Sequence, residues 1–473
     1  MKIAIIGGGI SGCAIYLLLK KHLQPLPAGK QYSITIYEAH DMNKETKSSE
    51  RAKGLPHSAT LTVGGGLGVG PNGLGVLRRL DEEVLRDVVR GGYVTPIMIM
   101  KSKGGQVLVR ANQGDALPPN AASEHAMSTV SSSRHSIWRA LRTRVSNNDI
   151  VIKRVSQVVA NPDGPNTIEF VDGSPPIEAD LIIGADGLKS RVKLALFPEA
   201  EKDPYPPRYE GLVGVGGFIS ASGVRDHVEK GAMNFVFGGN GFFGYFFSES
   251  AESSPYRDSP HHIADPGERL AWWSTYEVSE CPTTATIDKG AITRQLQERH
   301  RGWGDPVIQE ILQSLEVDTM WPTWTVPPLP TWERDGVVLV GDAAHALPPT
   351  SGQGCAQALE DVEAFVLLLS HSLQNADQEQ IEANPKSLVK TAARQYMALR
   401  VPHVAQILRE AQTIQNSKRD KGTISEYLMY GVLWIMSFFP NVIFKKQYSV
   451  FTYNVADEVK KMTDICYLCR LWL

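Results

Sequence analysis

The chain has 473 residues, of which 42% are hydrophobic and 21% charged. This length allows two or three domains with a large core, and the composition is that of a globular protein. The 48 basic and 51 acidic side chains leave a formal net charge of −3, which gives no electrostatic footprint for nucleic acid. We therefore expect no nucleic-acid partner. Five cysteines argue against a disulfide framework and for a reducing compartment.

The first forty residues follow the pattern of a βαβ unit. An apolar run at residues 3–6 stops at a glycine-rich turn, a helical pattern follows, and a second predicted strand ends at Glu38. Gly7 allows a tight turn, Gly9 lets the backbone approach a pyrophosphate, and Gly12 lets helix and sheet pack closely. The helix N-terminus offers free N–H groups to an anion, so the pattern predicts a nucleotide site in which Glu38 binds ribose hydroxyls.

A glycine-rich surface turn without a ligand is the alternative interpretation. The strand before the glycines, the helix after them and the acid at the end of the next strand favour nucleotide binding. Glu38 follows Gly12 by 26 residues (38 − 12) rather than about 20, and a loop insertion at residues 25–30 would absorb the difference. Because Met1 nearly adjoins the first strand, we expect no signal peptide and a cytoplasmic protein.

A second glycine-rich stretch follows a polar segment. Residues 40–63 predict an exposed loop. Residues 64–73, which include Gly66 and Gly68, carry so few side chains that we expect a flat ligand to lie against their backbone.

Two later apolar strands end at turns suited to a ligand. The strand predicted at residues 179–183 leads to Asp186 and Gly187, and the carboxyl end of a strand is where an open α/β sheet presents binding groups. A plain helix cap by Asp186 is the alternative. The strand predicted at residues 336–340 leads through several glycines to a helix that begins near Cys355, which gives a second helix N-terminus suited to a negative charge.

The composition changes in the middle of the chain. Residues 204–330 are rich in Tyr, Phe and Trp in strand-like runs, which predicts a separate, mainly antiparallel sheet with one aromatic face. Ordinary core packing explains part of this pattern. The fold class is therefore α/β, with a Rossmann-like nucleotide-binding domain (residues 1–200 and 331–375), an inserted substrate-binding sheet domain (201–330) and C-terminal helices (376–473).

These motifs together resemble the group A FAD-dependent monooxygenases, the family of para-hydroxybenzoate hydroxylase, salicylate hydroxylase and zeaxanthin epoxidase. The chain is similar to fungal secondary-metabolism members in particular. Three motifs appear in the family's order: the Gly7–Gly12 turn with Glu38, Asp186-Gly187 with Ser190, and Gly341-Asp342-Ala343-Ala344-His345 through Gly354. The resemblance covers about residues 1–410.

The resemblance implies a cofactor site for FAD, with NAD(P)H as co-substrate. Its residues would be Gly7, Gly9, Ser11, Gly12, Glu38, Gly66, Gly68, Arg134, Asp186, Gly187, Asp342, Pro349, Gly352, Gly354 and Cys355. Glu38 would bind the adenosine ribose, Arg134 the phosphate side of FAD, and Asp342 the ribityl and pyrophosphate region. Pro349 would flank the isoalloxazine, and the backbone around Gly352 would face its N1 and O2 edge. Asp186 and Gly187 are linked in this family to both FAD and NAD(P)H.

Three departures from the family bear on the reaction. Lys193 stands where the family usually has Arg, and Ala356 where Asn or Ser is frequent. Residues 209–216 lack the Arg that holds a phenolate in many phenol hydroxylases, which tilts the prediction towards epoxidation. Tyr245 is the side chain we expect as the catalytic polar contact in the substrate cavity.

The resemblance implies that NAD(P)H and O2 yield a flavin C4a-hydroperoxide, which epoxidises or hydroxylates a bulky apolar small molecule. The alternatives are an aromatic (phenol) hydroxylase, an FAD-dependent isoprenoid reductase, a flavin halogenase and a non-catalytic nucleotide-binding scaffold. The halogenase rests on residues 321–327, which resemble a halogenase signature with spacing wrong by one residue. This reaction needs no metal, and the oligomeric state stays open.

The C-terminal segment 427–444 contains no charged residue and precedes Lys445 and Lys446. Its length is at the lower edge of a spanning helix. Trp434 and Pro440 suit an insertion at a membrane interface better than a full span, which predicts peripheral contact with an intracellular membrane. A helix packed on the catalytic domains is an equal alternative.

Overall fold

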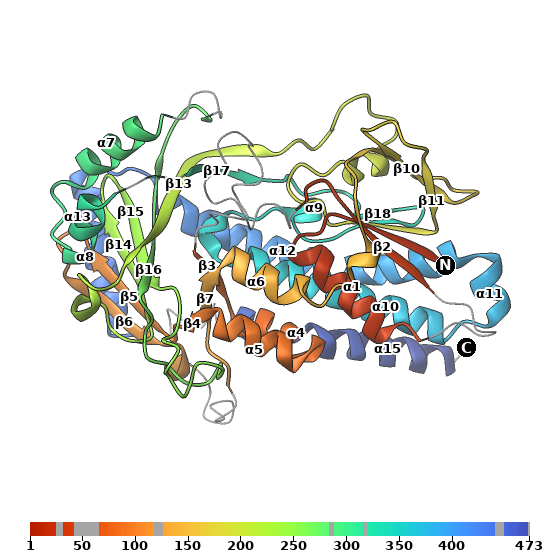
Figure 1. Ribbon diagram of the computed structural model, residues 1–473, viewed down its shortest axis with the longest axis horizontal. Coiled ribbons are helices and arrows are strands. Elements are labelled where there is room, and N and C mark those ends of the chain that lie inside the picture. The colour runs from red at the N-terminus through yellow and green to blue at the C-terminus, as the bar shows by residue number, and fades with distance from the viewer. Residues whose placement is uncertain are drawn as a thin grey trace.

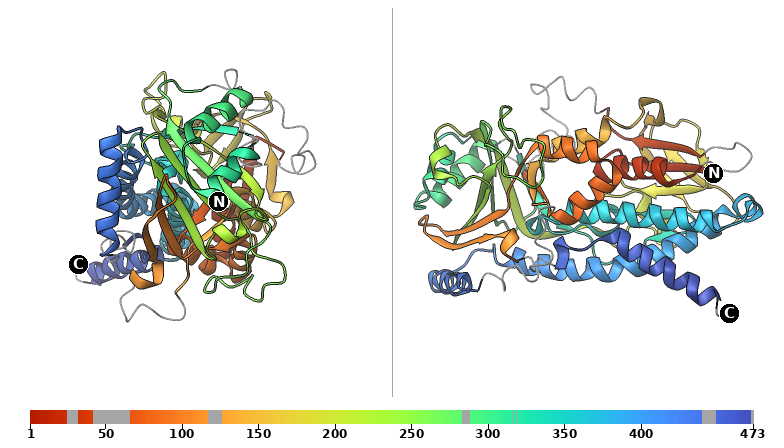
Figure 2. Two further views of the ribbon diagram at one scale, coloured as in Figure 1. Left: turned by 90° about the vertical axis from the view of Figure 1, so that its left-hand side faces the viewer. Right: turned by 90° about the horizontal axis from the view of Figure 1, so that it is seen from below.

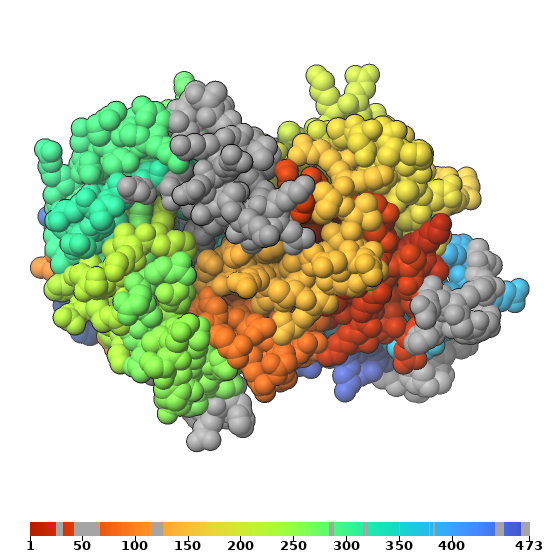
Figure 3. Space-filling view, viewed as in Figure 1, coloured from red at the N-terminus to blue at the C-terminus, as the bar shows by residue number. Residues whose placement is uncertain are grey.

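The computed structural model describes residues 1–24, 32–41, 66–116, 126–282, 288–315, 317, 319–439 and 449–471. The predicted insertion at residues 25–30 lies outside these ranges, and so does the predicted loop at 40–63 from residue 42 onward. Two sheets lie in opposite halves along the long axis of the molecule (Figure 1). In the space-filling view the green surface of the middle domain lies at the left, the red surface of the N-terminal residues lies to the right, and the orange surface lies between them (Figure 3).

A six-stranded sheet forms one half, in the order β18-β19-β12-β1-β2-β8. All of its neighbouring strands are parallel except β18, which is antiparallel to β19. The strands are β1 (Lys2–Ile6), β2 (Ser33–Glu38), β8 (Ile150–Ile152), β12 (Leu181–Gly184), β18 (Glu333–Arg334) and β19 (Val337–Leu339). β1 lies between β2 and β12 and is buried on both faces, which is why its sequence is a continuous apolar run.

Helices cover this sheet and extend along the molecule (Figure 2). α10 packs against α1, α4, α12 and α15, and its apolar side chains belong to the core of this half. The helices are α1 (Ile10–His22), α4 (Pro71–Leu80), α5 (Glu82–Arg90), α6 (Arg134–Arg142), α9 (Asp342–His345), α10 (Gly354–Gln374), α11 (Gln378–Ala383), α12 (Pro385–Asn416) and α15 (Val455–Leu471). The predicted Rossmann-like domain is confirmed.

Two three-stranded sheets flank the six-stranded sheet. One has the order β11-β10-β9 and the other β3-β7-β4. Their strands are β3 (Gly66–Val69), β4 (Gly92–Val94), β7 (Val130–Ser133), β9 (Val155–Val159), β10 (Asn166–Phe170) and β11 (Ile177–Ala179). β3 and β7 lie between the two halves (Figure 1).

A seven-stranded sheet forms the other half, in the order β17-β13-β16-β15-β14-β5-β6. Its strands are β5 (Ile97–Ser102), β6 (Val107–Asn112), β13 (Arg208–Ser220), β14 (Ala232–Gly238), β15 (Gly241–Phe247), β16 (Arg269–Glu277) and β17 (Thr319–Thr325). Every pair is antiparallel except β14 with β5, so the mainly antiparallel sheet is confirmed. The boundary at residue 200 needs one correction, because β5 and β6 come from the segment that we assigned to the nucleotide-binding domain.

The two faces of this sheet have different neighbours. Phe243, Tyr245 and Trp272 share one core with apolar residues of α7 (Lys289–His300) and α8 (Pro306–Gln313). Because side chains alternate along a strand, their neighbours point the other way. We call that side the inner aromatic face, and it consists of Phe235, Phe237, Phe242, Phe246 and Trp273.

Helix α13 (Thr423–Ser437) lies at the edge of the molecule, beside the seven-stranded sheet (Figure 2). One side of it is packed: Leu433 contacts the cluster of Val109 and Ala111, and Glu426 and Tyr430 are buried. The Tyr430 hydroxyl donates to the carbonyl of Phe237 at 2.6 Å. Among the described residues, no helix combines the length and apolarity needed to cross a bilayer. The end of the predicted segment, residues 440–444, lies outside the described ranges.

Candidate functional site

The first glycine turn joins β1 to α1, and its three glycines have different surroundings. Gly7 has a φ of +104°, and a Cβ there would lie 2.5 Å from the carbonyl oxygen of Ala185. A Cβ on Gly12 would lie 1.8 Å from the carbonyl oxygen of Gly7. A Cβ on Gly9 would meet no atom within 4 Å. The backbone packing around Gly7 and Gly12 therefore leaves no room for a side chain. Gly9 instead borders open space beside the start of α1, which no side chain caps.

The peptide groups of Gly8 orient this turn. Its N–H donates to Glu38 Oε2 at 2.6 Å, and its carbonyl accepts from the indole Nε1 of Trp138 at 2.9 Å. Glu38 Oε1 accepts from the N–H of His40 at 3.0 Å. A carboxylate can accept about four hydrogen bonds, so Glu38 retains capacity for ribose hydroxyls. Sequence reasoning missed Trp138, because no local signal links α6 to Gly8.

The start of α1 meets the turn after β19. The Ser11 hydroxyl oxygen lies 2.9 Å from the position that a Cβ on Gly341 would take, and Gly341 has a φ of +59°. Arg134 begins α6, and its Nη2 lies 4.0 Å from Asp342 Oδ2, with both side chains more than a third exposed. The structure thus brings Ser11, Arg134 and Asp342, which are far apart in the sequence, to one place.

A second uncapped helix N-terminus lies beyond Asp342. After the 3-10 turn η6 (Pro349–Ser351), Gly352 has a left-handed φ of +66° and Gly354 begins α10 without a side-chain cap. A Cβ on either glycine would meet no atom within 4 Å. Burial raises the pKa of Cys355 to about 12, while Arg134 lowers and Asp342 raises it, so the thiol stays neutral. This helix start can stabilise a negative charge through backbone N–H groups.

One carboxylate oxygen of Asp186 accepts hydrogen bonds, and the other has no partner among the described residues. Its Oδ2 accepts from the N–H groups of Arg191 and Val192 at 2.7 and 3.2 Å, which stabilises the start of the 3-10 turn η4 (Val192–Leu196). Its Oδ1 is buried and has no partner among the described residues, and burial raises the pKa of the carboxyl. Gly187 follows with a φ of +75°. Asp186 is not the N-cap residue of η4, which is Arg191, but it binds two backbone N–H groups there and also offers an oxygen to a ligand.

Lys193 does not replace the missing arginine at this turn. Its ammonium is buried, forms an ion pair with Asp203 at 2.7 Å and donates to the carbonyl of Tyr205 at 2.7 Å. The charge is thus satisfied within the protein.

The glycine-rich strand β3 lies against the substrate half. Gly66 and Gly68 pair with Ser133 and Ser131 of β7. A Cβ on Gly68 would lie 3.9 Å from Cε of Met233, which lies at the start of β14. Gly68 therefore lies close to the sheet that carries the inner aromatic face.

The groups described above would suit a ligand that carries a sugar and an anionic or polar group at each of two places. The two uncapped helix starts, the Glu38 carboxylate and the orphan Oδ1 of Asp186 meet those needs, and the open space at Gly9 and Gly352 admits a ligand close to the backbone. The residues present therefore fit a dinucleotide, and FAD is the one that the family resemblance implies.

Comparison with known proteins identifies the same cofactor class. The family described as FAD binding domain matches residues 260–395. Salicylate hydroxylase of Pseudomonas putida is 25% identical over 79% of this chain and 77% of its own length. Chloroplastic zeaxanthin epoxidase of an Oncidium hybrid cultivar is 26% identical over 86% of this chain and 53% of its own. Over most of its length the chain is similar to the group A FAD-dependent monooxygenases. It is an FAD-dependent oxidoreductase.

The fold of this FAD monooxygenase also matches solved structures. HpxO of Klebsiella pneumoniae, determined with FAD and uric acid, superposes with a TM-score of 0.65 at 19% identity, over 98% of this chain and 96% of that one.

A buried ionic network binds the residues on both sides of Asp342 and so fixes this turn. Asp361 Oδ2 accepts from the N–H of Gly341 at 3.0 Å and contacts His345 Nε2, and Asp361 Oδ1 accepts from Nε of Arg400 at 2.9 Å. Burial alone would raise the pKa of Asp361, but the charges of His345 and Arg400 lower it to about 2. Arg400 is fully buried and also pairs with Glu360 at 2.6 Å. Sequence reasoning missed this network, which joins residues from three separate helices.

Tyr245 lies away from the cofactor residues, on the face covered by α7 and α8. Its hydroxyl accepts from Nζ of Lys101 at 2.6 Å and donates to Asp305 Oδ2 at 3.0 Å, and all three groups are buried. Desolvation and the neighbouring Asp305 raise the pKa of this phenol far above its ordinary value. This phenol is neutral, buried and hydrogen-bonded to Lys101 and Asp305, and its catalytic role stays a prediction.

We predict opposite outcomes for two alanine substitutions in the first glycine turn. Gly12→Ala should prevent soluble, folded protein, because its methyl group would overlap the backbone of Gly7. Gly9→Ala should fold with unchanged thermal stability after removal of FAD but purify with less flavin, since its methyl group enters only ligand space. Flavin absorbance measures the cofactor content of each variant, and thermal melts measure its stability. A fully flavin-loaded Gly9→Ala enzyme would contradict the assignment.

Glu38 gives a second prediction. Glu38→Ala removes ribose acceptors and should weaken FAD binding by about 2 kcal/mol, or about thirtyfold in Kd. Glu38→Gln is the matched control: its amide oxygen can still accept from Gly8, so it should lose less affinity than the alanine variant. Titration of the apoenzyme with FAD, followed by flavin fluorescence, measures both. Equal affinity of Glu38→Ala and the wild type would exclude Glu38 from the site.

Proposed function

We propose that this FAD monooxygenase uses NAD(P)H and O2 to epoxidise or hydroxylate a bulky apolar substrate. The inner aromatic face carries this proposal. Phe242 and Phe246 are buried on it, whereas Phe235, Phe237 and Trp273 are half-buried. The indole of Trp321 also lies on this face. It covers Gly214, where a Cβ would lie 2.1 Å from the indole Nε1. Such a surface next to the glycine strand β3 favours an extended apolar or aromatic body.

The residues of the chain mainly bind, orient and exclude water. When bound, FAD accepts a hydride from the reduced nicotinamide and supplies the oxygen-activating chemistry. Glu38 and the two helix starts would hold the cofactor, and the aromatic face would place the substrate against β3 and limit water there. β13 offers no arginine between Tyr209 and Gly216, and an alkene needs less acid–base help than a phenol. Both points favour epoxidation over phenol hydroxylation.

The rival reactions differ in observable ways. An isoprenoid reductase would oxidise NAD(P)H with substrate but would not consume O2. The halogenase alternative depends on residues 321–327, which include Trp321 and Trp324. In the structure Trp321 packs over Gly214, and Trp324 packs on Tyr209 with ring centroids 5.7 Å apart, so packing accounts for both.

The reaction itself is tested by spectroscopy and product analysis. The purified holoenzyme should be yellow, bleach with NADPH or NADH under nitrogen, and recover its colour in air. With polyene, terpenoid and aromatic candidates under labelled O2, one labelled oxygen atom should enter a product. Reduction of a substrate without oxygen uptake would favour the reductase, and a halogenated product formed with chloride would favour the halogenase.

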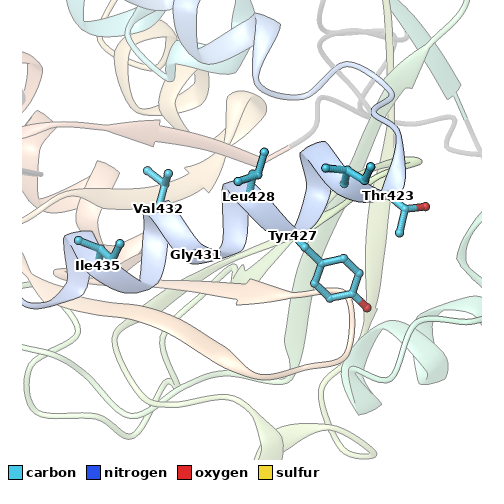
Figure 4. A pocket seen from close by; sticks show the side chains of 7 residues that line it. Thr423, Tyr427, Leu428, Gly431, Val432 and Ile435 are labelled. Atoms are coloured by element: carbon cyan, nitrogen blue, oxygen red, sulfur yellow. The ribbon is translucent and has the colours of Figure 1, made fainter.

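We further propose that the outer side of α13 contacts a lipid surface. An open apolar groove runs along this helix, lined by Thr423, Ile424, Tyr427, Leu428, Gly431, Val432 and Ile435. Figure 4 shows Leu428, Val432 and Ile435 projecting from the same side of α13. Ile424 is 81% exposed and Leu428 66% exposed. Exposed Tyr427 and Trp434 are suited to the membrane interface, and Lys445 and Lys446 follow in the sequence as partners for acidic headgroups.

The lipid contact predicts a loss of vesicle binding on polar substitution. Leu428→Ser combined with Val432→Ser should lower co-sedimentation with phosphatidylcholine–phosphatidylserine vesicles about tenfold or more, because two apolar side chains leave the bilayer interface. Ile152→Ser with Val171→Ser, comparably exposed in the other half, should bind like the wild type. If the first variant binds equally well, or instead converts a dimer to a monomer in size-exclusion chromatography, α13 does not serve as a lipid contact.

A further inference from the structure

We propose that Lys418 is a specificity-determining residue that binds an anionic oxygen at one end of the substrate. Lys418 lies just beyond the C-terminal end of α12, and its Nζ is 4.1 Å from the centroid of the Phe242 ring. Phe242 belongs to the inner aromatic face, so the ammonium lies on the side of the sheet where we place the substrate. This inference rests on the proposed function and gives the substrate a second chemical feature.

Lys418 differs from the other buried cations of the described chain. Lys101 pairs with Asp305, Lys193 with Asp203, and Arg400 with Glu360 and Asp361. Lys418 is only 6% exposed, and its ammonium has no hydrogen bond or ion pair with a described residue. Burial lowers the pKa of this lysine to about 7. A buried cation without a partner is unfavourable, and an aromatic ring compensates for it only in part.

A second unsatisfied group lies one turn earlier. The Gln415 side chain is 1% exposed and donates through Nε2 to Glu210 Oε2 at 3.1 Å. Its Oε1 is buried without a hydrogen-bond partner among the described residues. The end of α12 therefore carries both a donor and an acceptor that the protein itself leaves unpaired. Buried polar groups are normally paired, so both groups point to a polar ligand at this end of the substrate site.

The position of Lys418 sets the shape of that ligand. Gly68 of β3 lies near Met233, whereas Phe237, which pairs with Phe242, is four residues further along β14 (237 − 233). At ~3.3 Å per residue the two ends of the face are about 13 Å apart. The substrate would be an amphiphile whose carboxylate, phenolate or enolate binds Lys418, while its apolar body reaches the glycine strand. Lys418 thus orients the molecule and is not itself a catalytic residue.

The test compares binding of two fluorescent probes of equal size. 1-Pyrenebutyrate carries a carboxylate and 1-pyrenebutanol a neutral hydroxyl on the same apolar body. The FAD-loaded wild-type enzyme should bind the carboxylate at least tenfold more tightly, as measured by fluorescence anisotropy. Lys418→Met should abolish this preference without weakening binding of the alcohol, and Lys418→Arg should retain part of it. Binding of both probes is measured at about pH 6, where the lysine is protonated and the carboxylate is ionised.

A nearby lysine provides the matched control. The Lys421 ammonium donates to the carbonyls of Ser417 and Arg419, so Lys421→Met removes a charge from the same segment but not from the aromatic face. It should keep the wild-type preference. Flavin content and thermal stability should be unchanged or higher in Lys418→Met, because an unpaired buried charge is removed. An unchanged preference in Lys418→Met, or equal loss of both probes, would overturn the proposal. Because binding is measured without turnover, this result is independent of whether the enzyme oxygenates its substrate.

Discussion

The ion pairs of Arg400 hold the cofactor half together. Asp361 is bonded to Arg400 on one side and to the Gly341 N–H and His345 on the other, so the turn that presents Asp342 is fixed by a helix that follows it in the chain. Glu360 extends the same network to Asn72 in α4 at 2.6 Å. Removing one partner of a buried pair typically costs about 3–5 kcal/mol, because the remaining charge stays buried. The network therefore specifies one arrangement of α4, α9, α10 and α12.

The helix that carries Arg400 also connects the cofactor to the substrate sheet. α12 begins beside the six-stranded sheet and ends near the inner aromatic face, where Lys418 follows it. Arg419, the next residue, pairs with Glu277 of β16 at 2.9 Å and donates to the carbonyl of Glu210 in β13. One rigid element thus sets both the position of the Asp342 turn and the distance to the substrate sheet. A shift of α12 would disturb both at once.

Local patterns account for the part of this structure that the sequence predicted. The βαβ unit, the strands that lead to Asp186 and Asp342, and the helix starts at Gly9 and Gly354 depend on periodicity and on glycine sterics over a few residues. Trp138, Arg400 and Lys418 could not be found this way, because their roles depend on pairings across the fold. The alternation of side chains along β15 predicts that Tyr245 lies on the opposite face of the sheet from Phe242 and Phe246. Only the packing of α7 and α8 shows which of the two faces is covered by helices.

The pairing of β5 with β14 has a consequence for how the enzyme folds. In the sequence β5 and β6 lie between β4 and β7, which pair with each other, yet β5 and β6 complete the seven-stranded sheet. No single continuous segment contains the substrate domain, so it cannot be produced by cutting the chain once on either side. Strands more than a hundred residues apart must meet before this sheet closes, and such long-range pairing slows folding.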